Sequence, residues 1–127
     1  MAGKKVLVIG LDPAFVDFSA PALAGAGITA EKIRAGLEGD GARLNGLGYQ
    51  AEILWIDDGD TAEQVLRERL AAERYDGVLI GAGLRTLPPH ALLFEALVNA
   101  VREAAPQARF AFNTNPADTA EAVQRAV

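Results

Sequence analysis

The chain has 127 residues, a net charge of −5 and no cysteine. This length predicts a single domain over residues 1–127. The lack of cysteine excludes disulfide scaffolds, thiolate zinc sites and cysteine nucleophiles. The 12 basic residues are scattered among 17 acidic ones, so we expect no nucleic-acid partner.

Four short apolar runs alternate with segments of helical periodicity, a pattern typical of βαβ units around a parallel sheet. The first and third runs are continuously apolar, which indicates central strands buried on both faces. The fourth alternates, with Phe110 and Phe112 on one side, and is expected at an edge. The predicted strands are residues 5–11, 51–57, 77–81 and 109–113.

A helix is predicted after each strand. The first begins near Thr29, whose hydroxyl can cap the free amides of a helix. The second begins at Asp60 in a capping-box pattern. The third runs from the prolines at 88–89 to about residue 105, and the fourth follows Pro116.

The third predicted helix is apolar over more than one face. A helix that covers a small sheet needs only one apolar stripe. The surplus predicts either a thick internal core or a homodimer contact through Leu93, Phe94 and Leu97.

Right-handed crossovers between four parallel strands leave few arrangements. The order 2-1-3-4 places the two most apolar strands at the centre. We therefore predict a three-layer, doubly wound α/β fold, Rossmann-like and with flavodoxin-like strand order. Ligands of such sheets bind at the switch point, here between the carboxyl ends of strands 5–11 and 77–81.

Polar residues follow the predicted strands at this edge. Arg85 is the one cation placed there, and a guanidinium suits a carboxylate or a phosphate. The same residue types also build turns and caps, and Asp12 or Asp57 could pair with Arg85, so a structural role stays open. The candidate ligand-binding residues are Asp12, Gly81, Gly83, Arg85 and Asn113.

Residues 81–83 form a GxG without the third glycine of the dinucleotide fingerprint, and they follow the third strand instead of the first. We therefore expect no cofactor. His90 is the only histidine, and without a histidine pair we expect no metal. The catalytic residues stay unknown, because only Asp12 or His90 offers a base and neither has a visible partner.

Residues 13–28 form a connection longer than the roughly 2–6 residues usual between a strand and its helix. The segment is rich in apolar residues and includes Phe15, Val16 and Phe18. It could form a lid or pocket wall, a short extra helix, or an interface.

The second half of the sequence resembles a response-regulator receiver domain. The resemblance rests on YDGVLI at 75–80, a proline-bearing loop, LFEAL at 93–97 and AAPQAR at 104–109. It implies a flavodoxin-like fold. Gly81 stands near the place of the phosphorylated aspartate, and Asp12 alone replaces the acidic pair after the first strand, so phosphorelay chemistry is not implied.

These features favour a non-catalytic module that binds a small anionic molecule or a protein partner at the carboxyl ends of the strands. One alternative is a small hydrolase or isomerase that uses Asp12 or His90 as base and Arg85 as anion clamp. Another is a structural homodimer formed through the third helix. No apolar run approaches the roughly 18 residues of a membrane span, and the lack of cysteine fits the cytoplasm.

Overall fold

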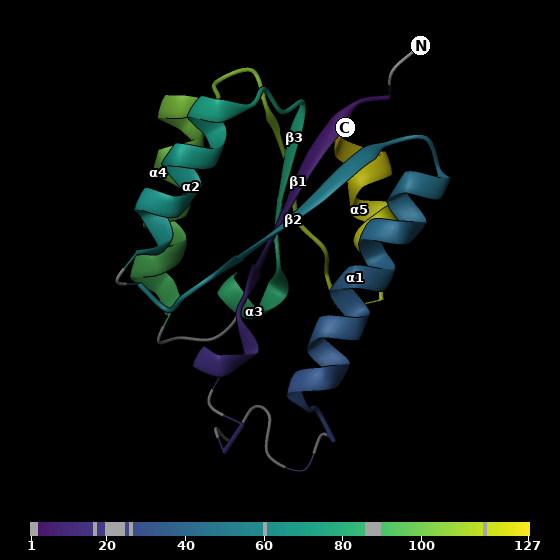
Figure 1. Ribbon diagram of the computed structural model, residues 1–127, viewed down its shortest axis with the longest axis vertical. Helices are drawn as coiled ribbons and strands as arrows, with labels where there is room; N and C mark the ends of the chain where they lie inside the picture. The colour runs from purple at the N-terminus through teal and green to yellow at the C-terminus, as the bar shows by residue number, and fades with distance from the viewer. Residues whose placement is uncertain are drawn as a thin grey trace.

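A computed structural model describes residues 3–16, 18–19, 25, 27–59, 61–85, 90–115 and 117–127. One four-stranded parallel sheet forms the centre of the fold, with strand order β2-β1-β3-β4. This confirms the predicted order (Figure 1). The strands are β1 (Lys5–Leu11), β2 (Gln50–Ile56), β3 (Gly77–Ile80) and β4 (Arg109–Ala111).

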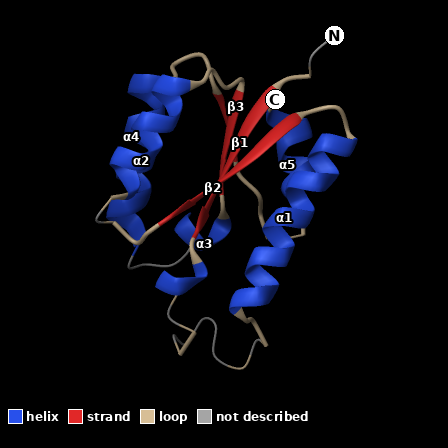
Figure 2. Cartoon of the chain, in the orientation of Figure 1, coloured by secondary structure: helices blue, strands red, loops and turns tan. Residues whose placement is uncertain are grey.

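Helices cover both faces of the sheet, as Figures 1 and 2 show. The pair α1 (Ala30–Gly46) and α5 (Thr119–Ala126) lies on one face, and the pair α2 (Ala62–Ala72) and α4 (Ala91–Ala104) lies on the other. Each pair closes its own hydrophobic core against the sheet. Alternate residues of β1 point into the two cores, which explains why this strand is apolar throughout.

Two short helical segments follow the central strands. The 3₁₀ turn η1 (Pro13–Phe15) begins the connection after β1, and α3 (Ala82–Arg85) follows β3 where the sequence suggested only a glycine turn. Leu84 is buried in the core beside α4, and burial of this side chain favours the helical turn. The fourth strand is also shorter than predicted, because it ends at Ala111 and Asn113 bonds to side chains instead.

The predicted cap of α1 is present in the structure, and at the start of α2 a carboxylate not named in the prediction accepts hydrogen bonds. Thr29 caps α1 by accepting from the Lys32 amide at 3.2 Å. The expected cap of α2, Asp60, lies outside the described residues. Asp57 accepts from Thr61 and Ala62 at the start of this helix, and the Thr61 hydroxyl bond in particular lowers the pKa of the Asp57 carboxyl.

The helix α4 contributes to a thick internal core. Leu93 and Leu97 are buried within the single chain, and of the three residues expected at a homodimer contact Phe94 is partly exposed. A homodimer through this helix stays a prediction. No helix within the described ranges is long and apolar enough to cross a membrane.

Candidate functional site

The carboxyl ends of β1 and β3 lie side by side, at the end of the sheet where α3 lies in Figure 1. The Gly81 amide donates to the Ile9 carbonyl at 3.1 Å, which extends the pairing of the two strands by one bond. A Cβ built on Gly81 would lie 3.3 Å from the same carbonyl oxygen. The close approach that this glycine permits is thus to the neighbouring strand, and Gly83 is exposed with open space beside its Cα.

The Arg85 guanidinium is held entirely by neutral groups. Its Nε donates to the Ile80 carbonyl at 2.9 Å, and its Nη2 donates to the backbone carbonyl of Asn113 and to Asn113 Oδ1, the latter at 2.8 Å. The face of the guanidinium lies 5.1 Å from the centre of the Phe112 ring. Within the described residues no carboxylate forms an ion pair with it, so neither Asp12 nor Asp57 is its partner.

Burial lowers the pKa of the Arg85 guanidinium, and the more distant charge of Asp118 opposes this effect. Asp118 is itself engaged elsewhere, because it accepts from the amides of Thr114 and Asn115 and from the Thr114 hydroxyl. The Thr114 hydroxyl in particular lowers the pKa of the Asp118 carboxyl. Asp118 therefore acts on Arg85 through its charge and forms no ion pair with it among the described residues.

Asn113 holds Arg85 in place and is itself buried. It is only 5% exposed, and its Nδ2 donates to the Thr119 hydroxyl at 3.3 Å. Thr119 is buried at the first turn of α5 and faces Asp40 of α1, where burial raises the pKa of the carboxyl and the Thr119 hydroxyl lowers it. No sequence pattern indicates this connection, because Thr119 resembles an ordinary helix-start residue.

Asp12 lies at the other side of the switch point with its own cation. Its Oδ1 accepts from the Ala14 amide at 2.9 Å, which caps η1, and lies 3.4 Å from Arg34 Nη2. Both side chains of this ion pair are well exposed to solvent. The structure thus assigns Asp12 a cap and an exposed pair, and it makes no direct bond between Asp12 and Arg85.

His90 lies at the start of α4, with Nδ1 3.0 Å from the Gly83 carbonyl oxygen. A carbonyl cannot donate, so Nδ1 carries the proton in this contact and a neutral ring keeps its Nε2 lone pair. The structure therefore joins His90 to Gly83, and joins Arg85 to Asn113. It does not bring His90 and Asp12 into contact.

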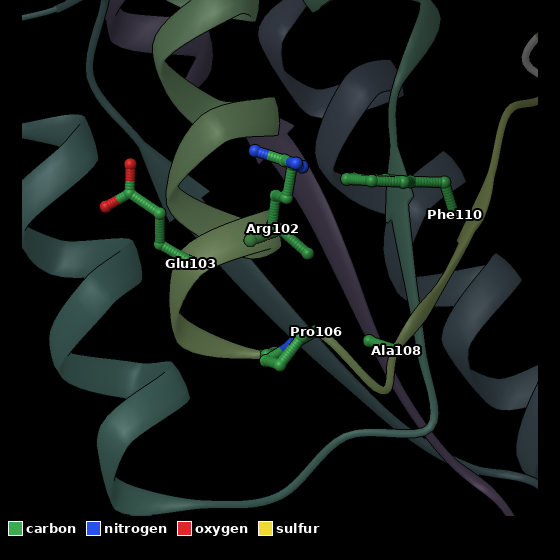
Figure 3. Close-up of a pocket in the computed structure, with 7 residues that line it drawn as sticks. Arg102, Glu103, Pro106, Ala108 and Phe110 are labelled. Carbon is green, nitrogen blue, oxygen red and sulfur yellow. The ribbon is translucent and has the colours of Figure 1, made fainter.

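Two cavities lined by described residues lie away from these side chains. A cavity of about 340 Å³ lies between the end of α4 and β4 (Figure 3), and a second of about 250 Å³ lies between the ends of α2 and α4. Of the connection 13–28, η1 confirms a short extra helix with Pro13 buried and Val16 against the core. Residues 17, 20–24 and 26 of this segment lie outside the described ranges, as does the loop 86–89.

Comparison with known proteins adds no family. No protein-family model and no curated protein matches this chain. The resemblance to receiver domains is therefore supported only at the level of a parallel α/β fold. Among the described residues no group of three His, Asp or Glu side chains is arranged to hold a metal ion.

Proposed function

We propose that this protein is a non-catalytic module that binds a small anionic molecule at the carboxyl ends of β1 and β3. Arg85 supplies the positive charge. The observation that carries this proposal is that, among the described residues, a partly buried guanidinium is bonded only to neutral oxygens.

A partly buried charge whose direct contacts are all neutral is costly, and an anion beside it would offset that cost. A guanidinium has five N–H donors, and the contacts of Arg85 use Nε and Nη2. Among the described residues nothing bonds to Nη1, so its two hydrogens can donate to a carboxylate or phosphate oxygen. Three fixed contacts hold the group before any ligand arrives, so little conformational entropy is lost on binding.

The test is a thermal-shift and calorimetric screen against nucleotides, sugar phosphates and small carboxylates. A ligand at 100 times its dissociation constant adds about 2.7 kcal/mol, which in a domain of this size shifts Tm by roughly 3–6 °C. We expect Arg85→Met to abolish the shift. The matched control is Arg125→Met, because Arg125 also donates to a backbone carbonyl at the end of β4, at Phe112, yet lies exposed on α5.

A ligand that binds Arg85→Met as tightly as the wild type would contradict the proposal. Silence of the whole panel against the wild type would also remove it and leave a protein partner as the occupant of this end of the sheet.

A small hydrolase or isomerase is the second candidate, favoured by the contact between His90 and the Gly83 carbonyl. A ring held through Nδ1 presents Nε2 in a fixed direction, as a general base requires. Turnover of any ester or keto-acid substrate that is lost in His90→Gln, while ligand binding persists, would favour this candidate.

The cytoplasm stays the expected compartment because the chain has no cysteine.

A further inference from the structure

The open edge of β4 carries a cluster of aromatic side chains. The rings of Phe110 and Phe112 stack with centroids 5.8 Å apart, and Phe94 of α4 lies 6.1 Å from Phe112. All three are partly exposed. Within the described chain β4 pairs with β3 alone, so the backbone amide and carbonyl of Phe110 face the other side. The Phe112 carbonyl on that side accepts from Arg125 at 2.9 Å, and the Ala108 amide donates to the Ala105 carbonyl.

The cavity of about 340 Å³ opens beside this edge. Arg102 and Phe110 lie across it from one another, while Glu103 points away from it (Figure 3). Glu103 is paired with Arg67 of α2 at 3.1 Å. One side of α4 is thus occupied by its neighbour within the chain, and the opposite side faces the open edge.

Helical periodicity defines which residues face that edge. Arg102 lines the cavity together with Phe110, so the residues near Arg102 on the helical wheel also face this way. Val98 lies four residues before Arg102, and Glu95 lies seven residues before it. Glu95 and Arg102 are exposed, and neither forms a hydrogen bond or an ion pair within the described chain.

Glu95 and Arg102 of one α4 helix are complementary in charge to the same two residues of a second copy. Glu95 and Arg102 stand on either side of a midpoint next to Val98. If a second α4 lay antiparallel to the first, each glutamate would meet the arginine of the other helix, and Val98 would meet Val98. A twofold axis makes both contacts at once, as an isologous dimer requires.

The same axis fits the strand. Phe94 of α4 lies beside Phe112, so these two residues are at the same height along the sheet. Phe110 lies two strand residues from Phe112, a distance of roughly 6.6 Å. That distance equals about four residues of helix, so Phe110 lies level with Val98. An axis through the midpoint of the α4 charges therefore also passes through the middle of the β4 edge.

The spacing between layers agrees with this arrangement. Paired strands lie about 4.8 Å apart, so a helix seated between β3 and β4 would stand about 5 Å from the axis. Its symmetry mate would then lie about 10 Å away, the distance at which helices pack.

We propose that a second copy of this chain docks on this face. The two β4 strands pair antiparallel around Phe110, the two α4 helices pack around Val98, and the cavity beside Arg102 is covered. This contact is centred on Phe110 and Val98 and does not depend on ligand binding at Arg85, although the Phe112 ring touches both the aromatic cluster and Arg85.

Charge reversal tests the proposal by sedimentation velocity from micromolar to millimolar concentration. We expect Glu95→Arg and Arg102→Glu each to weaken self-association about tenfold or more, because like charges then face each other. An equimolar mixture of the two variants should associate again, since every interface pair is then opposite in sign. Glu103→Arg is the control, because that residue faces α2 and should leave association unchanged.

A covalent variant gives an independent readout. Val98→Cys introduces the only cysteine next to the axis, and oxidation should join two copies quickly. Leu92→Cys, at a position 79% exposed on the outer face of α4, should react slowly. A wild-type protein that stays monomeric at millimolar concentration, or a variant mixture that associates no better than its components, would overturn the proposal and leave the edge to a strand of a different protein.

Discussion

The two edge strands of the sheet, β2 and β4, carry different kinds of side chain. At the β2 edge, Glu52 lies between Lys5 and Arg69, at 3.6 and 3.5 Å, and accepts a hydrogen bond from the Tyr75 hydroxyl. At the β4 edge stand three phenylalanines and no comparable network among the described residues. Charges on an edge strand oppose pairing with another chain. We therefore expect the longer strand β2 to resist such pairing and the shorter strand β4 to allow it.

The comparison teaches that strand length does not decide which edge is available. The strand β2 has seven residues and β4 has three, yet the chemistry favours the shorter. Any ion pair at the β2 edge would have to be broken and desolvated before a new strand could be added. The aromatic edge gains by losing contact with water.

The largest expected effect comes from breaking the aromatic edge. Phe112→Ala removes the ring that joins Phe94, Phe110 and Arg85, and we expect unfolding in urea to become easier by roughly 2–3 kcal/mol. Phe15→Ala, at a position 45% exposed on η1, should change stability by less than about 0.5 kcal/mol. Equal effects at the two positions would mean that the aromatic cluster is not a packed unit.

An intermediate effect is expected at the charged edge from Tyr75→Phe. The Tyr75 side chain is fully buried, and its hydroxyl donates a hydrogen bond to Glu52. Loss of that bond should lower the free energy of unfolding in urea by about 1 kcal/mol.

The titration of Tyr75 offers a second readout of the same bond. Burial, followed by the Glu52 hydrogen bond, raises the pKa of Tyr75 from 10.0 to about 12. The folded state then holds this proton more tightly than the unfolded chain, so stability should fall as pH rises from about 10 toward 12. Absorbance titration of wild type against Tyr75→Phe checks this, and a phenol that titrates at its ordinary value would show that the hydroxyl is neither buried nor bonded to Glu52.

Glu52→Gln is expected to have the smallest effect on folding. It tests most directly whether the charge at the β2 edge opposes self-association. Exposed ion pairs contribute well under 1 kcal/mol each, so urea unfolding should barely change. Removal of the edge charge should instead increase self-association, measured by light scattering at high concentration. Glu63→Gln removes a paired carboxylate from the outside of α2 and serves as the control. Equal scattering from both variants would mean that Glu52 does not guard the edge.

The sequence predicted the sheet better than the site. The apolar run of β1 and the caps such as Thr29 are local features, and the strand order follows from them by simple rules of topology. The prediction for Arg85 placed the residue at the correct end of the sheet but named the wrong neighbours. Its partners are two backbone carbonyls and one amide oxygen, and no pattern of side-chain types marks a carbonyl as an acceptor.

The sequence by itself determined the class of fold, the order of the strands and the end of the sheet where polar residues gather, because periodicity and turn chemistry act over a few neighbouring residues. Only the tertiary structure decided which charges are satisfied. Arg67 meets Glu103 across 36 positions, while Arg102, one residue earlier on the same helix, meets nothing within the described chain. The difference is a matter of which side of α4 each residue occupies once α2 has packed against it, and that is set by the packing of helices on the sheet.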